Sequence, residues 1–372
     1  MKICFLAAAS LIHAVRWVNA FAEKEHEVHL ITMHAEKLDK INPNVHVHQL
    51  TIPAPVGYYV NFIEAKQRLK KIDPDIVHIH YASGYGTLGR LVDHHPSILS
   101  VWGTDVFIFP ELNQRNNKIL RKNLQSADQI TSTSYAMKEV TKQYITPTVP
   151  IEVIPFGIDV NKFSPNNVQT NRESIVIGTV KRLEDVYGID TLIKVTAKVV
   201  EQLHLKNQSD IAEQLKLKII GDGSQKESLR QLAANLNIDH LTEFIGDIPH
   251  EKVPDYLNQL DVYCAFSRSE SFGVAVLEAS ACEVPVVVSD VGGLAEVVQH
   301  GKTGFIISEN NMEEMAIKLV ELILEKELRD QMGRNGRSFV EEYYNWNINV
   351  NQMEQVYEKV VKRHQEYEYS KD

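Results

Sequence analysis

The sequence predicts an α/β protein with two domains, each built on a parallel β-sheet that helices cover. The chain has 372 residues, a length that usually forms about two domains. Short runs rich in β-branched residues alternate with helical stretches, and these runs are apolar on both faces, which is typical of parallel strands. A loop rich in proline, glycine and asparagine at residues 154–173 separates two sets of such runs, and we place the domain boundary there.

Five strands are expected before this loop and six after it: Ile3–Ala7, Val28–Thr32, Ile76–His80, Ile98–Trp102 and Ile130–Ser134, then Ile175–Val180, Leu217–Gly221, Leu241–Ile245, Val262–Phe266, Val284–Ser289 and Gly304–Ile307. We therefore expect an N-terminal domain at residues 1–155, a linker at 156–172, a C-terminal domain at 173–345 and a final segment at 346–372.

The chain after the last expected strand has a helical pattern. Helices are expected at Met312–Glu327 and Arg329–Tyr343. Within Ile348–Glu366, apolar residues recur at the spacing of an amphipathic helix. We expect this last helix to pack back on the N-terminal domain.

Composition indicates a soluble protein of the cytoplasm. The first residues are apolar, but Lys2 is the only early positive charge and Arg16 interrupts the run, so a buried strand is favoured over a signal peptide. No stretch of about 18 apolar residues lacks a charge, so no membrane-spanning helix is expected. The three cysteines form no C-x-x-C motif, which argues against disulfides and a zinc site and fits a reducing compartment.

The strongest chemical signal follows the strand Val262–Phe266, where a glycine lies between two glutamates eight residues apart: Glu270, Ser271, Phe272, Gly273, Val274 and Glu278. We expect Ser271 to cap a helix that begins near Phe272, so that backbone N–H groups and the positive helix end face a diphosphate. Glu278 would lie about a turn and a half into that helix and accept hydrogen bonds from ribose hydroxyls. Glu270 would reach the sugar. Taken by itself, such a pair is more often two incidental glutamates on a capped helix.

The segment that contains this motif reads Ser267-Arg268-Ser269-Glu270-Ser271-Phe272-Gly273, Glu278-Ala279-Ser280-Ala281, Pro285-Val286-Val287 and Gly292-Gly293-Leu294-Ala295-Glu296. In this order it resembles glycosyltransferase family 4, with Glu283 where the family often has glycine. Weaker similarity extends over residues 154–163, 177–193, 219–229 and 244–263. The resemblance implies the GT-B fold, in which two Rossmann-like domains have parallel sheets that face a central cleft.

The resemblance also implies a function, that of a retaining glycosyltransferase of the hexosyltransferase type. It would move a sugar from a nucleoside diphosphate sugar, most commonly a UDP-sugar, to a glycan or lipid-linked acceptor in polysaccharide or cell-surface glycan synthesis. The N-terminal domain would bind the acceptor and the C-terminal domain the donor. The implied donor-binding residues are Gly221, Gly223, Ile248, Ser271, Phe272, Gly273, Val274 and Glu278. The resemblance implies no cofactor and no metal.

Two departures from the family pattern concern catalysis. Relatives place an arginine over the diphosphate and a lysine shortly after it; Arg182 fits the first role, but Val186 stands where we expect the lysine. Lys181 is adjacent to Arg182, and strand alternation predicts that it points to the opposite face. Many relatives have a histidine where this chain has Trp102, while Asp105 keeps its place as a catalytic candidate or, alternatively, a helix cap. A UDP-sugar 2-epimerase of the same fold and a catalytically impaired nucleotide-sugar-binding subunit therefore stay open as alternatives.

The first loop of the N-terminal domain offers Ser10 and His13 as contacts for the acceptor or a phosphate, although a lone histidine is more often structural. His78 and His80 fall on one face of an expected buried strand with no matching carboxylate, so no metal site is expected there.

Two basic runs lie in the first 150 residues, which carry 16 basic and 13 acidic side chains in a chain whose net charge is −10. On helices, residues 66–71 and 118–124 could lie along an anionic bilayer beside Leu120 and Leu124. This would bring the protein to the inner face of the cell membrane by peripheral contact; a solvated helix face is the alternative. Nucleic acid is not an expected partner, because the clusters lack interleaved aromatic residues and the protein is acidic.

Overall fold

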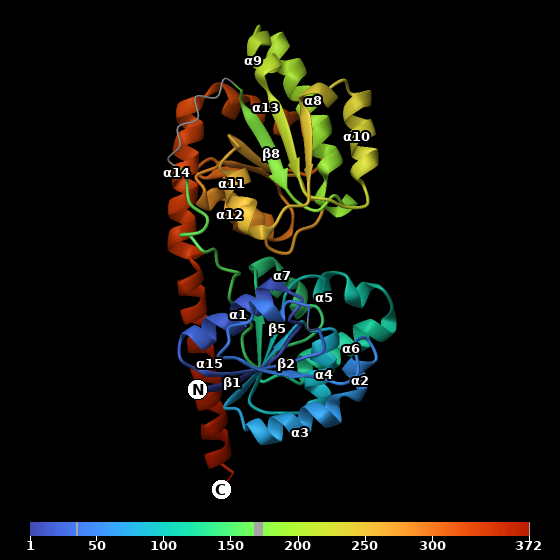
Figure 1. Ribbon diagram of the computed structural model, residues 1–372, viewed down its shortest axis with the longest axis vertical. Coiled ribbons are helices and arrows are strands. Elements are labelled where there is room, and N and C mark those ends of the chain that lie inside the picture. Colours follow the sequence, from blue (N-terminus) through green and yellow to red (C-terminus); the bar gives the residue numbers. More distant parts are fainter. Residues whose placement is uncertain (35, 167–173, 372) are drawn as a thin grey trace. The chain divides into compact units, whose positions relative to one another are not determined.

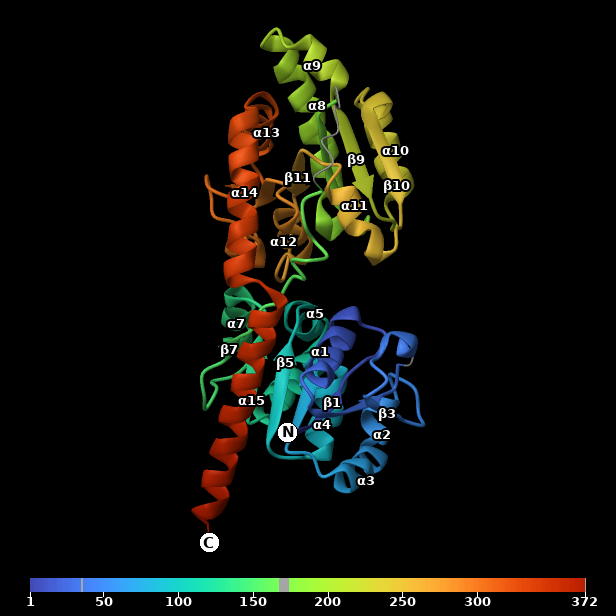
Figure 2. The ribbon, with the colours of Figure 1, turned by 60° about the vertical axis from the view of Figure 1, so that its left-hand side comes forward.

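The computed structural model describes residues 1–34, 36–166 and 174–371, so residues 167–172 of the expected linker lie outside the described part. The chain divides into two compact units (Figures 1 and 2). Unit 1 comprises Met1–Phe156 together with Asn347–Asp372, and unit 2 comprises Gly157–Trp346. Each unit has its own parallel sheet, which confirms the predicted α/β class with two parallel-sheet domains.

The sheet of unit 1 has seven parallel strands in the order β3-β2-β1-β4-β5-β6-β7. The strands are β1 (Lys2–Leu6), β2 (Glu27–Thr32), β3 (His46–Gln49), β4 (Ile76–His80), β5 (Ser97–Val101), β6 (Gln129–Ser132) and β7 (Glu152–Val153). The helices are α1 (Ile12–Glu23), η1 (Leu38–Lys40), α2 (Gly57–Val60), α3 (Phe62–Ile72), α4 (Gly84–Val92), α5 (Thr104–Phe107), η2 (Phe109–Glu111), α6 (Gln114–Gln125) and α7 (Tyr135–Lys142).

The long last helix, α15 (Trp346–Tyr369), contacts the sheet and α1 of unit 1 through one face. Val350, Met353, Val356, Tyr357 and Val360 are all at most 4% exposed. The hydroxyl of Tyr357 lies 2.5 Å from Nδ1 of His78 in β4, and the Tyr357 ring packs on Phe21 of α1. Burial lowers the pKa of His78 to about 3, so this imidazole is neutral in the folded protein.

The sheet of unit 2 has six parallel strands in the order β10-β9-β8-β11-β12-β13. The strands are β8 (Val176–Val180), β9 (Lys216–Ile220), β10 (Thr242–Gly246), β11 (Val262–Ala265), β12 (Val286–Ser289) and β13 (Gly304–Ile307). The helices are η3 (Asp185–Tyr187), α8 (Ile189–Leu205), α9 (Ser209–Gln214), α10 (Lys226–Asn235), η4 (Asp239–Leu241), η5 (His250–Lys252), α11 (Val253–Leu257), α12 (Val274–Ala281), η6 (Gly292–Glu296), α13 (Met312–Leu324) and α14 (Lys326–Tyr343).

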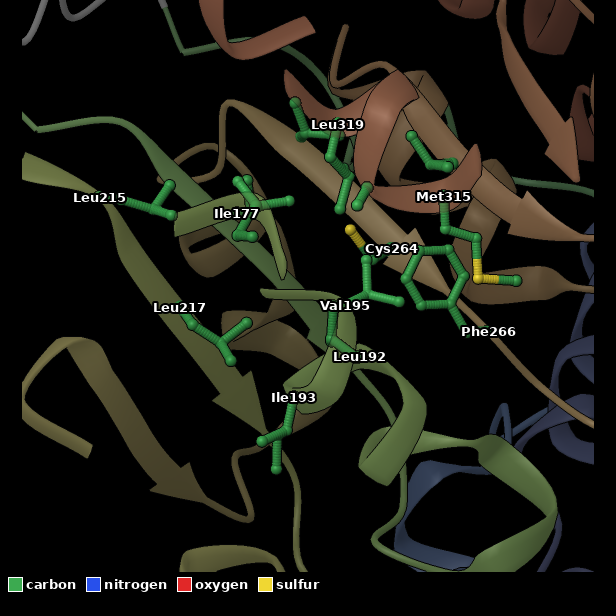
Figure 3. Packing of buried hydrophobic residues seen from close by; sticks show 14 of the residues in the cluster. Ile177, Leu192, Ile193, Val195, Leu215, Leu217, Cys264, Phe266, Met315 and Leu319 are labelled. Atoms are coloured by element: carbon green, nitrogen blue, oxygen red, sulfur yellow. The ribbon is translucent and has the colours of Figure 1, made fainter. Parts of the chain in front are cut away.

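The largest part of the unit 2 core lies between the sheet and helices α8 and α13. Ile177, Leu192, Cys264 and Leu319 belong to this cluster (Figure 3), and each is at most 1% exposed. Burial of large apolar side chains from strands and helices alike is what fixes the sheet under these helices. The carboxyl ends of the strands are thereby held rigidly, and the loops that follow them carry the expected site residues.

All eleven strands predicted from sequence are present, with ends that differ by at most two residues. No helix within the described ranges is long and apolar enough to cross a bilayer. Cys4, Cys264 and Cys282 are unbridged and buried, in agreement with the expectation that the chain has no disulfide framework. Leu120 and Leu124 of α6, which the sequence suggested would face a bilayer, are 0% and 1% exposed and pack into the unit 1 core. That expectation is wrong, because these leucines lie on the inner face of the helix.

Candidate active site

The helix that follows the double-glutamate motif begins later than the sequence predicts. α12 starts at Val274, and its N-cap is Gly273, whose φ of 109° lies in the left-handed region. The N-cap position is therefore held by Gly273 and not by Ser271, so the prediction that Ser271 caps a helix beginning near Phe272 is wrong. The backbone turns into the helix through a φ that only glycine adopts at little cost.

The backbone of the loop before α12 is held by the glycine pair of η6. The N–H of Gly293 donates to the carbonyl oxygen of Glu270 at 2.9 Å. Gly292 has a φ of 49°, and a Cβ at this position would lie 2.0 Å from the same carbonyl oxygen. A Cβ on Gly293 would lie 2.5 Å from the carbonyl oxygen of Ser271, so both glycines allow η6 to pack closely on this loop, which explains their place in the motif.

The carboxylate of Glu270 forms an ion pair with the ammonium of Lys181. The two side chains are only 13% and 11% exposed, and the Lys181 nitrogen lies 4.8 Å from the centre of the Tyr187 ring. Burial by itself would lower the pKa of Lys181, but Glu270, Tyr263 and Tyr187 beside it raise this pKa above its usual range. The pair is thus a fixed, charged group at the start of the α12 motif.

Arg182, the predicted diphosphate contact, points elsewhere. Its side chain is 76% exposed, and its guanidinium lies 3.7 Å from Oε1 of Glu184. β8 ends at Val180, so Lys181 and Arg182 lie in the loop that follows, and their side chains diverge. The expectation from strand alternation does not apply in this loop, but the two side chains do have different partners, Glu270 for Lys181 and Glu184 for Arg182.

The glycine-bearing loop after β9 supports the Lys181 loop. A Cβ on Gly221 would lie 1.9 Å from the carbonyl oxygen of Lys181, and one on Gly223 would lie 2.5 Å from that of Leu183. Amide N–H groups of Lys181 and Leu183 donate to Ile220 and Asp222 at 2.9 and 3.0 Å. These two predicted donor residues therefore shape the loop that carries Lys181. Their contact with a ligand stays a prediction.

Glu278 has a basic partner that sequence reasoning did not find. It lies one turn inside α12 and is 7% exposed. Oε1 of Glu278 accepts from Nε2 of His250 at 3.1 Å, and Nδ1 of His250 lies 2.9 Å from Nζ of Lys162. His250 opens η5, just after the half-buried Ile248. Phe272 is buried near Tyr344, with ring centres 5.9 Å apart.

Asp105 of unit 1 is fully buried and serves the backbone. Its carboxylate accepts from the N–H groups of Ala82 and Gly103 at 2.8 Å and of Trp102 at 3.1 Å. Burial raises the pKa of Asp105, while these amide donors act in the opposite direction. The side chain therefore joins the loop after β4 to the loop after β5 and fixes the position of both loops.

Aromatic rings gather where β1, β4 and β5 of unit 1 end. His13 stacks on Phe156 at 4.1 Å between ring centres, and Phe156 lies 5.2 Å from Trp102. His80 lies 4.5 Å from Trp102 on its other side. Ser10 is in the turn between β1 and α1, close in sequence to His13. The assignment of these two residues to the acceptor or a phosphate stays a prediction.

Unit 2 therefore places Glu270 in the loop before α12 and Glu278 one turn inside that helix, each with a basic partner. Unit 1 holds Asp105, Ser10 and His13 at the carboxyl ends of its own strands. Across the described ranges, no group of three or more histidine, cysteine or carboxylate side chains could hold a metal ion.

Comparisons with known proteins identify the family and the fold of the chain. The family model for glycosyl transferases group 1 matches residues 160–339, and the model for glycosyl transferase 4-like proteins matches residues 2–134. N-acetyl-alpha-D-glucosaminyl L-malate synthase of Bacillus anthracis is 27% identical over 365 residues, which cover 92% of this chain and 91% of that protein.

Two solved structures share the fold over nearly the whole chain. Sucrose-phosphate synthase from Thermosynechococcus elongatus has a TM-score of 0.81 at 20% identity, with 98% of this chain and 100% of that chain covered. Anabaena HepE, crystallised with UDP-glucose, has a TM-score of 0.80 at 18% identity, with coverage of 96% and 100%. The chain belongs to the family 4 type of glycosyltransferases with the GT-B fold, and it is a sugar transferase.

Proposed function

We propose that this protein transfers a sugar from a UDP-sugar, with retention at the anomeric carbon, to a glycan or lipid-linked acceptor. The observation that carries the proposal is the pair of carboxylates before and within α12, the half-buried Glu270 held by Lys181 and the buried Glu278 held by His250. Carboxylates with fixed partners suit hydrogen bonding to sugar hydroxyls, because their orientation is set before the ligand arrives.

In this proposal Glu270 accepts hydrogen bonds from hydroxyls of the donor sugar, and Glu278 does so from the ribose. The N–H groups at the start of α12, from Gly273 and Val274 onward, face the diphosphate, where the helix dipole favours negative charge. His250 orients Glu278. Asp105 keeps the loops after β4 and β5 of unit 1 in place.

Lys181 is proposed to supply the cation that the departing diphosphate needs. Its raised pKa keeps it charged near neutral pH, and a charge held in place offsets the charge that builds on the leaving phosphate without reorganisation. Arg182 is given no such role here, because its side chain is directed to solvent. This chemistry would use no metal ion, so we expect activity to survive treatment with EDTA.

UDP is favoured over other nucleotides because two solved relatives of this fold carry it. HepE was crystallised with UDP and with UDP-glucose, and TarM of S. aureus was crystallised with UDP. A glycan or lipid-linked acceptor is proposed because unit 1 resembles the acceptor-binding domain of family 4 glycosyltransferases. We place the reaction in the cytoplasm, a reducing compartment that suits three unbridged cysteines.

Thermal unfolding with a panel of nucleotides tests the proposal. A ligand at one hundred times its Kd stabilises by about 2.7 kcal/mol, which raises the Tm of a domain of this size by roughly 5–10 °C. We expect UDP and UDP-sugars to produce such a rise, and GDP and ADP to produce little. Glu278→Gln should reduce the rise with UDP, whereas Glu243→Gln, an exposed control, should leave it unchanged. No rise with any uridine nucleotide would contradict the proposal.

A further inference from the structure

A chain of three side chains in unit 2 reaches Glu278 from outside the motif. Nζ of Lys162 lies 2.9 Å from Nδ1 of His250, and Nε2 of the same ring lies 3.1 Å from Oε1 of Glu278. The three residues come from the segment that opens unit 2, from η5 and from α12 (Figure 1). We call this chain the 162–250–278 relay. It connects a half-buried ammonium to a carboxylate whose side chain is only 9% exposed.

The donors and acceptors of the relay fix the position of the proton on the histidine ring. An ammonium group can only donate, so Nδ1 of His250 accepts from Lys162. A neutral imidazole whose Nδ1 accepts carries its proton on Nε2, and this N–H donates to the carboxylate of Glu278. The charge of Lys162 polarises the ring and strengthens the second hydrogen bond. Glu278 is therefore held by a donor whose direction is set two residues away.

The segment that carries Lys162 is joined to α12 by backbone contacts. The N–H of Lys162 donates to Oδ1 of Asp159 at 3.1 Å. The guanidinium of Arg337, from α14, donates to the carbonyl oxygen of Phe163 at 3.2 Å and to that of Ala281, the last residue of α12, at 2.6 Å. The lysine end of the relay and the helix at its other end therefore share one anchor.

A buried aromatic ring holds the two outer members of the relay. The Phe163 ring is 3% exposed, and the ring of His250 lies edge-on to it, with 5.7 Å between ring centres. Nζ of Lys162 lies 5.3 Å from the centre of the same Phe163 ring. Edge-to-face packing and a cation near the ring are both favourable, so the geometry of the relay is set by packing as well as by hydrogen bonds.

We propose that Lys162 and His250 are positioning residues for ribose recognition, and that through Glu278 they make the site select a ribonucleotide over its 2′-deoxy analogue. This inference rests on the proposed function, in which Glu278 accepts hydrogen bonds from the ribose. Because His250 holds Oε1, the carboxylate keeps one orientation, and hydrogen bonds from the ribose hydroxyls form without reorganisation. A nucleotide that lacks the 2′-hydroxyl leaves this nearly buried carboxylate short of a donor, which weakens its binding.

Calorimetric titration of the full chain with UDP and with 2′-deoxy-UDP tests this role. The quantity to compare is the ratio of the two Kd values, because a purely structural defect weakens both nucleotides alike. We expect the unchanged protein to prefer UDP by about tenfold to a hundredfold, since the 2′-hydroxyl bonds to a charged acceptor. His250→Phe keeps a ring beside Phe163 but has no N–H donor, and it should reduce this preference at least about fivefold.

Two further variants and a control separate positioning from packing. His250→Gln keeps an N–H donor and should retain more of the UDP preference than His250→Phe. Lys162→Met removes the ammonium and keeps the stem, so the preference should fall about threefold, because the ring is no longer held in one tautomer. The matched control is Lys252→Met. Lys252 also lies in η5, is 65% exposed and pairs with Asp255 at 3.5 Å, so this variant should keep the full preference.

Proton–nitrogen NMR correlations of the histidine rings test the relay without any nucleotide. Under mildly alkaline conditions the ring of His250 should carry its proton on Nε2, and the signals that are missing in His250→Phe assign it. A proton on Nδ1 would overturn the inference, because that nitrogen could not accept from Lys162.

The titrations distinguish a failure of this inference from a failure of the proposed function. UDP binding without preference over 2′-deoxy-UDP, a preference that His250→Phe leaves unchanged, or an equal loss in Lys252→Met would overturn the inference alone. No binding of either uridine nucleotide by the unchanged protein would overturn the proposed function and this inference with it.

Discussion

Replacing Lys181 with methionine removes the ammonium that pairs with Glu270 and keeps a flexible side chain of similar length. In the folded protein the Glu270 carboxylate is 13% exposed, so the substitution leaves a nearly buried charge without its cation. Removing one partner of a buried pair costs about 3–5 kcal/mol of stability, and the remaining access to water places this pair near the lower end. We therefore expect Lys181→Met to lower the free energy of unfolding by about 3 kcal/mol.

The effect on catalysis follows from the same geometry. If Lys181 offsets charge on the leaving diphosphate, its removal should lower kcat by a factor of about 10² to 10³, as for other preorganised electrostatic contacts. Arg182→Met is the matched control, since this adjacent side chain is 76% exposed and its ion pair spans 3.7 Å. Exposed pairs of this kind are worth less than about 1 kcal/mol, so stability and kcat should change little.

Urea unfolding and initial rates of UDP release measure the two effects separately. The double variant Lys181→Met/Glu270→Gln should regain part of the lost stability, because no buried charge is left unpaired, but it should not regain activity. The reasoning fails if Arg182→Met loses as much activity as Lys181→Met, or if Lys181→Met keeps activity within threefold of the unchanged protein.

Two further predictions concern the backbone of the site and the pH dependence of stability. Gly292→Ala should lower the free energy of unfolding by at least about 3 kcal/mol and weaken UDP binding in calorimetry, because its Cβ would press on the carbonyl of Glu270. The control is Gly301→Ala, where φ is similar and a Cβ would have no atom within 4 Å. This change should lower the free energy of unfolding by about 1 kcal/mol and leave UDP binding intact. Burial lowers the pKa of His78 to about 3 and that of His80 well below its usual value, so on acidification only the unfolded chain takes up these protons near pH 6.5. The free energy of unfolding should therefore fall by about 2 kcal/mol per histidine between pH 7 and pH 5. In urea unfolding, His78→Gln should show a fall about 2 kcal/mol smaller than that of the unchanged protein. An equal fall in the two proteins would argue against a neutral buried His78.

The fold was largely predictable because its strands are buried on both faces. Runs such as Ile76–His80 and Val286–Ser289 are fully buried in the structure, and isoleucine and valine on both faces of each run signal this directly. The two strands that were missed are edge strands. β3 has exposed and half-buried polar residues, and β7 is two residues long, so neither leaves a hydrophobic pattern in the sequence.

The site was predictable where one local motif contains it. Glu270, Gly273 and Glu278 lie within nine residues, and their order identifies the turn and the helix that follows. Their partners come from other elements. Lys181 and His250 are 89 and 28 residues distant from the glutamates they contact, and no local pattern connects them.

The sequence did not reveal that Lys181, and not Arg182, pairs with Glu270, for an identifiable reason. Alternation of side chains in a strand shows which neighbours diverge but not which of the two faces a ligand-binding loop. That choice is made by the tertiary packing of the loop, here by Gly221 and Gly223 beneath the carbonyl groups of Lys181 and Leu183. The cap predicted at Ser271 failed in a similar way, because the turn is closed by Gly273 and by contacts with Gly292 and Gly293.

Proton NMR of the full-length protein with a UDP-sugar tests the central claim most directly, with and without a pool of glycan and lipid-linked acceptors. Our account predicts slow hydrolysis at most without acceptor, and UDP release with a new glycosidic bond of retained anomeric configuration when the acceptor is present. Turnover of the UDP-sugar to its 2-epimer without acceptor would contradict it, as would tight binding with no product from any donor and acceptor pair.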